Sequence, residues 1–242
     1  MKDQAQRLGA DLVGIAPALP FPEASAYDRW IAGGLQGSLD YMSKRAEARR
    51  DIRAWYPQAK SVLLCGFSYA DNAADPAPAG RGRVSRYARL PDYHSLLKER
   101  LTRLLDWLKA AHAGSDGRVF VDTSPLLERL YARYAGLGWV GRNTMLISPQ
   151  KGSYFFIAGL ALNLDLAHDE PTADRCGNCR RCVEACPTNA FTADRQLDAG
   201  RCISEFTIER RGAIPAEMRQ GVGDWVFGCD ICQEVCPWNR FA

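Results

Sequence analysis

The chain contains Cys176-Gly-Asn-Cys179-Arg-Arg-Cys182-Val-Glu-Ala-Cys186-Pro187, and this stretch decides how its last third folds. A second run near the C-terminus reads Cys229-Asp-Ile-Cys232-Gln-Glu-Val-Cys236-Pro237, and Cys202 stands alone between the two. Three cysteines in steps of three, followed by a fourth before a proline, are typical of polypeptides that hold two iron–sulfur clusters. The spacing therefore predicts two 4Fe–4S clusters.

The first run has the spacing of bacterial ferredoxins, in which three cysteines hold one cluster and the fourth crosses to the other. On that pattern, one cluster is held by Cys176, Cys179, Cys182 and Cys236. The second cluster is held by Cys186, Cys202, Cys229 and Cys232. The proline after each crossing cysteine stops a helix and turns that cysteine toward the neighbouring site. We expect a small ferredoxin-like double-cluster domain over residues 167–242.

Clustered cysteines can also bind zinc or form disulfides. Zinc sites usually show two C-x2-C pairs separated by a long spacer, which is not the pattern here. Disulfides need an oxidising compartment, and nothing at the N-terminus resembles a secretory signal. The ninth cysteine, Cys65, lies in an apolar run and is expected to be a buried structural thiol.

Composition allows one large core and a small satellite domain, since 47% of the 242 residues are hydrophobic. No apolar stretch reaches membrane-spanning length, so we expect a cytoplasmic protein that does not enter a membrane. The formal net charge is +3. Eight thiolates around two cores of about +2 each would add roughly −4 and bring the loaded protein near neutrality. Attraction to a polyanion would then depend on local patches.

Residues 1–166 read as alternating strands and helices, which predicts an α/β (α+β) domain. Apolar runs at 62–67, 118–121 and 154–162 are expected to be buried strands. Leucines at helical spacing predict a helix over 95–112, and a proline start predicts another over 125–135. Ligands would bind outside the carboxyl ends of the strands. The loop over 71–82 lacks an apolar face and should be exposed.

Three features of this first domain leave both a structural and a functional interpretation open. Asp122 follows a predicted strand, where it would either cap the next helix or face a ligand. Glu128 and Arg129 would be ordinary helix-surface residues if Asp122 is only a cap. The glycine-rich stretch at 135–144 would be a turn or a close approach to a flat ligand. Basic residues between 81 and 89 would form a solvated edge or contact phosphate.

Taken together, these segments resemble the epoxyqueuosine reductase family, which completes queuosine synthesis in tRNA. The matching strings are Gly82-Arg-Val-Ser-Arg-Tyr-Ala88, Asp92-Tyr-His94, Val121-Asp-Thr123, Ala135-Gly-Leu-Gly-Trp-Val-Gly-Arg-Asn-Thr144, Gly152-Ser153, Cys202-Ile-Ser204, Thr207-Ile-Glu209, Ile214-Pro215 and Gly228-Cys-Asp-Ile-Cys-Gln-Glu-Val-Cys-Pro-Trp-Asn239. They cover nearly the whole chain in the family's order. The Val-Asp-Thr segment combined with the displaced Cys202 is the specific part of this likeness.

The resemblance implies a cobalamin beside the two clusters and the reduction of epoxyqueuosine to queuosine in the tRNA anticodon. It makes Asp122 the proton donor to the epoxide oxygen, with a pKa expected to be raised beside the corrin ring. Positions that match the family's cobalamin contacts are Arg49, Ser85, Asp122, Gly141, Thr144, Phe155, Ser204, Cys229 and Asp230. No histidine lies in a D-x-H-x-x-G arrangement, which fits a cobalamin with an open lower face. His94 is expected to pack at the start of the leucine helix.

Family members commonly continue past the final cysteine motif into a helical-repeat region that helps to hold tRNA, whereas this chain ends at Ala242. A truncation or a short form would change tRNA affinity more than the chemistry. The alternatives are a corrinoid reductive dehalogenase, whose usual twin-arginine signal is not seen in residues 1–7, and a ferredoxin-type electron-transfer module. The expected partners are tRNA carrying epoxyqueuosine and an electron donor such as a flavodoxin or ferredoxin. The protein is expected to be a monomer.

Overall fold

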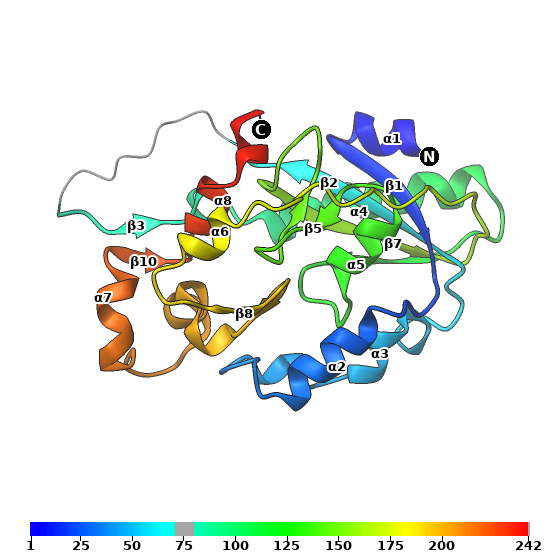
Figure 1. Ribbon diagram of the computed structural model, residues 1–242. Coiled ribbons are helices and arrows are strands. Elements are labelled where there is room, and N and C mark those ends of the chain that lie inside the picture. Colours follow the sequence, from blue (N-terminus) through cyan, green and yellow to red (C-terminus); the bar gives the residue numbers. More distant parts are fainter. Residues whose placement is uncertain (71–79, 242) are drawn as a thin grey trace.

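The computed structural model describes residues 1–70 and 80–241 (Figure 1). Of the loop predicted over 71–82, residues 71–79 lie outside the described part, and Gly80, Arg81 and Gly82 are exposed. Within the described residues, no helix is both long and apolar enough to cross a membrane.

A four-stranded sheet forms the centre of the first region, with the strand order β1-β2-β7-β4. The strands are β1 (Leu12–Pro17), β2 (Ser61–Ser68), β7 (Phe155–Leu162) and β4 (Gly117–Val121). The strands predicted over 62–67, 118–121 and 154–162 are therefore confirmed. β1 is absent from the prediction because Gly14 and Pro17 interrupt its short apolar run. Cys65, on β2, is fully buried, and burial raises the pKa of its thiol to about 12.

The sheet is antiparallel at every pairing, which corrects the expectation that ligands bind at the carboxyl ends of all its strands. That rule describes open parallel sheets. Here β2 and β4 run in one direction and β7 in the other, so the ends of β2 and β4 meet the start of β7. Residues Ser68, Asp122 and Phe155 accordingly lie toward the same edge of the sheet.

Helices cover both faces of this sheet and give it two apolar cores (Figure 1). On one face, α4 (Tyr93–Ala111) packs beside α1 (Lys2–Arg7), and all five leucines of the predicted stripe are buried. On the other face lies α5 (Glu128–Tyr134), which contacts β1, β2 and β7. A Cβ on Gly14 would meet the Ala135 carbonyl oxygen at 1.9 Å, so the end of α5 approaches β1 closely because this position is glycine.

Helix α5 begins three residues later than the predicted start at Pro125, and its N-cap position is Leu127. No side chain caps it by a hydrogen bond. The interpretation of Asp122 as a helix cap is therefore wrong. The shorter helices α2 (Ala24–Ala32) and α3 (Ala46–Arg50) precede β2.

The cysteine-bearing region is built from short elements around a small core of Ile203, Phe206, Val222 and Trp225. Its helices and strands are α6 (Arg181–Glu184), β8 (Phe191–Ala193), β9 (Gln196–Leu197), a π-helix (Glu205–Glu209), α7 (Arg219–Val222), β10 (Trp225–Phe227) and α8 (Ile231–Glu234). Three 3-10 helices complete the region, at Ala199–Arg201, Ala216–Met218 and Pro237–Phe241. Helices α6 and α8 each end two residues before a Cys-Pro pair. The boundary predicted between residues 166 and 167 falls in a segment, 165–176, without helix or strand.

Strand pairing and aromatic packing are among the contacts that join the cysteine region to the sheet region. Strand β3 (Arg83–Val84) pairs in parallel with β10, from the far end of the chain (Figure 1). The hairpin of β5 (Trp139–Val140) and β6 (Leu146–Ile147) packs Trp139 and Ile147 against Cys236 and Trp238. Segments far apart in the sequence are thereby held together around the cysteines.

Candidate redox and active site

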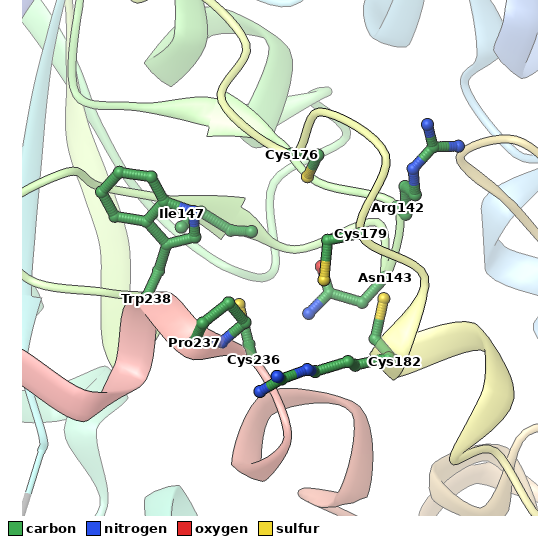
Figure 2. A pocket seen from close by; sticks show the side chains of 10 residues that line it. Arg142, Asn143, Ile147, Cys176, Cys179, Cys182, Cys236, Pro237 and Trp238 are labelled. Atoms are coloured by element: carbon green, nitrogen blue, oxygen red, sulfur yellow. The ribbon is translucent and has the colours of Figure 1, made fainter.

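The first cysteine group lines a single pocket at the surface of the cysteine region. Figure 2 shows Cys176 and Cys179 on one loop and Cys182 at the start of α6, facing the same space as Cys236, which comes from the C-terminal segment. The indole Nε1–H of Trp139 donates to Cys176 Sγ at 3.3 Å. Burial raises the pKa of the Cys236 thiol, and the nearby Cys176 and Cys179 raise it further. Four thiols from two distant segments thus meet in one place.

The second group brings together Cys186, Cys202, Cys229 and Cys232. Burial raises the pKa of Cys229 to about 12, with Cys202 and Cys186 among the further causes. Burial also raises the pKa of Cys202, where the backbone N–H groups of Ser204 and Glu205 face the sulfur. The two spatial groups are the two sets that the ferredoxin pattern pairs, and their roles as ligands stay a prediction.

The spacing of these thiols bears on the zinc interpretation. Zn–S bonds of about 2.3 Å place the sulfurs of a tetrahedral zinc site roughly 3.8 Å apart. Among residues 1–70 and 80–241, no three Cys, His, Asp or Glu side chains are close enough to hold one metal ion. The preference for iron–sulfur clusters over zinc rests on the spacing of the cysteines in the sequence.

Asp122 directly follows β4 in the left-handed conformation, with φ 53°. Its side chain is 59% exposed. The Tyr93 hydroxyl donates to Asp122 Oδ2 at 3.0 Å, and His94 Nε2 lies 3.2 Å from the same oxygen. Both neighbours contact the same oxygen of the Asp122 carboxyl, so its other oxygen is available to a ligand.

His94 links Asp122 to a second carboxylate. Its Nδ1 lies 2.8 Å from Asp92 Oδ1, and its backbone N–H donates to the same oxygen at 2.9 Å. Partial burial acts to lower the pKa of His94, but the hydrogen bonds to Asp92 and Asp122 outweigh it and raise that pKa. As expected, His94 lies at the start of α4. It also forms a pair with Asp122, and a proton can be shared between the two side chains.

Behind Asp122 lies Glu128, and the structure corrects the expectation that it is a surface residue. Its Oε1 is buried without a hydrogen-bond partner among the described residues. Burial raises the pKa of Glu128 to about 8, and the charge of Asp122 adds to the shift while the backbone N–H of Asp122 lowers it. Arg129 donates from Nη1 to the Thr144 carbonyl at 2.5 Å, and Thr144 is itself left-handed, with φ 61°. The start of α5 therefore contacts two strained loops at once.

The expected cobalamin contacts fall on two sides of one region. Arg49 is 7% exposed, its Nη2 donates to the Tyr41 carbonyl at 3.2 Å, and its charge acts on Glu128 behind Asp122. On the other side, Asp230 lies buried between Cys229 and Cys232 and accepts the Arg86 backbone N–H at 2.7 Å. Burial raises the pKa of Tyr87, and the carboxylates of Asp122 and Asp230 raise it further, so Tyr87 lies between the two sides.

Two further expected contacts pack against the protein itself. Phe155 lies toward the same end of the sheet as Asp122, its side chain is 6% exposed within the core cluster, and its contact with cobalamin stays a prediction. Its neighbour Phe156 stacks on Tyr93 with ring centroids 3.9 Å apart. At Gly141 a Cβ would meet Ile147 Cδ1 at 2.4 Å. Close packing within the chain's own hairpin accounts for a glycine at this position, and its contact with cobalamin stays a prediction.

Among the residues expected to contact cobalamin, Ser85 is the one whose surroundings best fit a bound ligand. It is 1% exposed, and its Oγ has no hydrogen-bond partner among the described residues. Gly228 (φ 67°) lies so near that a Cβ there would be 2.1 Å from this oxygen. Arg49 Nε and the Tyr154 hydroxyl are also buried without partners in the described part of the chain. Unsatisfied polar atoms on both sides of the region fit a polar ligand such as cobalamin.

The basic stretch between 81 and 89 is only in part a solvated edge. Arg83 donates to Glu234 at 2.9 Å and lies over the Trp225 ring at 4.1 Å. Arg86 lies over the Tyr154 ring at 4.9 Å, and Arg89 donates to the Val84 carbonyl. Arg83 therefore fastens β3 to the cysteine region, whereas Arg81 and Arg89 are exposed, and contact of this stretch with phosphate stays a prediction.

The sequence alone did not indicate Tyr93, His94 or Glu128 as members of the site. Tyr93 and His94 stand next to a helix cap, and Glu128 has the spacing of a surface position. The signal that the sequence does contain is the string Asp92-Tyr-His94, which is part of the family resemblance.

Fold and site together define a redox protein with an antiparallel α/β region and a double-cluster region. A family described as "4Fe-4S double cluster binding domain" matches residues 175–239, and one described as "Epoxyqueuosine reductase QueG, DUF1730" matches residues 49–123. An epoxyqueuosine reductase of Cyclobacterium marinum is 41% identical over 244 residues, covering 100% of this chain and 79% of its own length. The chain belongs to the epoxyqueuosine reductase family.

Solved structures agree with this assignment. The chain matches an epoxyqueuosine reductase crystallised with an epoxyqueuosine-modified tRNA stem loop, with a TM-score of 0.90 and 35% identity. The match covers 99% of this chain and 64% of that one, so the chain spans less than two thirds of the crystallised relative. A catabolic reductive dehalogenase matches with a TM-score of 0.61 at 19% identity, which shows a shared fold alone.

Proposed function

We propose that this protein reduces epoxyqueuosine to queuosine in the anticodon of a tRNA, with Asp122 as the proton donor. The observation that carries this proposal is the geometry at Asp122: an exposed carboxyl at the sheet edge, fixed through one oxygen by Tyr93 and His94. Support also comes from the family and from the relative crystallised with an epoxyqueuosine-modified stem loop.

The reaction requires a proton source because an alkoxide is a poor leaving group. Two electrons and two protons convert the epoxide to an alkene and water. In our proposal, Asp122 gives a proton to the epoxide oxygen as the carbon–oxygen bond breaks. His94, whose raised pKa keeps it protonated to higher pH than an ordinary histidine, then returns a proton to Asp122. Asp92 holds the His94 ring in place through Nδ1.

Electrons would come from two 4Fe–4S clusters, one held by Cys176, Cys179, Cys182 and Cys236 and the other by Cys186, Cys202, Cys229 and Cys232. Support for this partition is that the fold brings together these two sets and that a double-cluster family matches residues 175–239. Each cluster carries one electron at a time.

Cobalamin, when bound, would supply the cobalt centre that passes these electrons to the carbon–oxygen bond. Residues with buried, unpartnered polar atoms on both sides of the Asp122 region would hold it, namely Arg49, Ser85 and Tyr154. The Asp230 carboxylate keeps β3 in place beside that site by accepting the Arg86 N–H. Phe156 and Tyr93, stacked on each other, would shield the Asp122 carboxyl from water on one side.

The test is turnover of an epoxyqueuosine-bearing anticodon stem loop by anaerobically reconstituted protein, followed by mass spectrometry of the nucleoside. Asp122→Asn keeps size and polarity but cannot donate an acidic proton. We expect normal loading with iron and cobalamin and a loss of about 10²-fold or more in turnover. Near-normal conversion by fully loaded Asp122→Asn would exclude Asp122 as the donor. Absence of conversion by the loaded wild-type chain would exclude the reaction itself.

A further inference from the structure

The two cysteine groups differ in their distance from Asp122. Asp230, between two cysteines of the second group, accepts the Arg86 N–H, and the ring of the next residue, Tyr87, lies 6.4 Å from that of Tyr93, which donates to Asp122. The first group adjoins the second through Asn143, which lines the pocket of the first group and donates to the Cys232 carbonyl at 3.3 Å. The order in space is therefore first group, second group, Asp122. An electron on its way to a substrate held at Asp122 would therefore enter at the first group.

The first group also lies next to solvent. Its pocket is lined by Cys176, Cys179 and Cys182, all partly exposed, and by the side chain of Arg181. Residues 175–180 before α6 include no helix or strand. A carrier protein could therefore bring its own cofactor close to this group without any rearrangement of the sheet region.

Three arginines surround this entrance. Arg175, Arg180 and Arg181 each stand directly beside a cysteine of the first group and are exposed. Over residues 1–70 and 80–241, none of the three takes part in an ion pair or side-chain hydrogen bond. The ion pairs found beside them use other groups: Arg142 with Asp194, and Arg195 with Asp174 and Asp194. Glu184, at the end of α6, is the exposed acid on the same segment.

We propose that Arg175, Arg180 and Arg181 form the docking surface for an acidic one-electron carrier protein that reduces the first cluster. This inference rests on the proposed function and names the kind of donor it uses. Four thiolates around a core of about +2 leave roughly −2 at this site, which repels an acidic partner. The three arginines offset that charge and steer the carrier toward the pocket. Two such one-electron deliveries, each oxidising one carrier, supply the two electrons that the epoxide takes up.

An RNA backbone is also attracted to arginines. The substrate base must reach Asp122, however, whereas these arginines lie beside the cysteine group farther from Asp122. Their position therefore favours an electron donor over the tRNA.

The experiment measures electron exchange between cluster-loaded protein and a flavodoxin, in whichever direction is spontaneous, by stopped-flow absorbance. The variant carries Arg175→Gln, Arg180→Gln and Arg181→Gln. We expect its second-order rate to fall about tenfold at low ionic strength, with the difference disappearing toward 1 M salt, where the Debye length is about 3 Å. The cationic methyl viologen radical should reduce the variant's clusters at least as fast as those of the wild type.

The matched control carries Arg7→Gln, Lys98→Gln and Arg103→Gln, three exposed cations on α1 and α4. It should exchange electrons with flavodoxin at the wild-type rate. Iron content and cluster spectra of all proteins must agree before rates are compared. This measurement needs neither substrate nor cobalamin, so its failure is separate from failure of the proposed reaction.

Equal flavodoxin rates for wild type and variant would overturn the proposal, as would an equal slowing with methyl viologen or in the control variant. Weaker binding of the anticodon stem loop to the variant, with unchanged electron exchange, would assign these arginines to RNA.

Discussion

The cysteine region and the sheet region hold their functional groups in opposite ways. In the cysteine region, most of the cysteines come from two short runs, and the apolar core beneath them is small. In the sheet region, two extensive cores support a site whose members come from α3, α4, α5 and the end of β4. Local spacing therefore sets the geometry of one site, and packing of distant elements sets that of the other.

The two regions meet along β3 and β10. Ser85 donates its backbone N–H to the Phe227 carbonyl at 2.9 Å, and Gly228 approaches the Ser85 side chain closely. A site between Asp122 and Asp230 depends on this junction as much as on either region. The following substitutions separate the contributions of cysteine spacing, the Asp122 group and the junction.

The largest effect is expected from Cys236→Ser. We predict that it removes the same cluster as Cys176→Ser, because both thiols line one pocket although they lie far apart in the sequence. Iron content and cluster spectroscopy of the two variants would measure this. Cys229→Ser serves as the comparison, since it should remove the other cluster. If Cys236→Ser and Cys229→Ser lose the same cluster, the partition is wrong.

Next comes His94→Asn, which removes the proton-carrying partner of Asp122. We expect about a tenfold loss of turnover in the loaded protein. The raised pKa of His94 implies that wild-type turnover falls as pH rises through that pKa. The stability that protonated His94 contributes follows the same direction: it is present at low pH and lost as pH rises through the raised value.

The measurement for His94 is a pH–rate profile of wild type and variant at equal cofactor loading. His112→Asn is the matched control, since His112 is exposed at the end of α4. A variant that keeps the wild-type decline at high pH would show that another group carries the proton.

Gly228→Ala tests the junction. The position has φ 67°, and the added Cβ would lie 2.1 Å from Ser85 Oγ, so both backbone strain and a clash oppose it. We expect a loss of about 2 kcal/mol or more, seen as a thermal midpoint lowered by roughly 4–8 °C, and weaker cobalamin binding. Gly223→Ala is the matched control, because its φ is 56° and nothing lies within 4 Å of its Cβ position. Equal thermal midpoints for the two variants would mean that backbone strain alone, and not the contact with Ser85, lowers the stability of Gly228→Ala.

The smallest effect is expected from Glu128→Gln. The raised pKa of about 8 means that the wild-type protein loses stability as pH rises from the ordinary value of Glu toward 8, when the buried carboxyl must ionise. Glutamine cannot ionise, so the variant should match the wild type near pH 5 and exceed it at pH 9. Because Glu128 is only partly buried, solvent reduces the cost of ionising it, and we expect a gain of roughly 2–4 °C, about 1 kcal/mol in a chain of this size. Glu99→Gln, on the exposed face of α4, should show no such pH dependence.

What the sequence determined by itself is largely local. Cysteine steps of three, the leucine stripe of α4 and three apolar strands follow from residue spacing, and each is found in the fold. The position of Asp122 after a strand was also predictable, because strand ends are marked by the change from apolar to polar residues.

Tertiary structure decided the rest. The antiparallel order β1-β2-β7-β4 depends on pairing between strands far apart in the sequence, which periodicity along the chain does not encode. The burial of Glu128 and the contact of His94 with Asp122 arise only when α4 and α5 pack on opposite faces of that sheet. Arg83 of the β3 stretch has the pattern of a surface charge, and it becomes a junction residue because Trp225 of β10 and Glu234 of α8 supply its partners. Contacts of this kind are set by three-dimensional packing, so no local pattern indicates them.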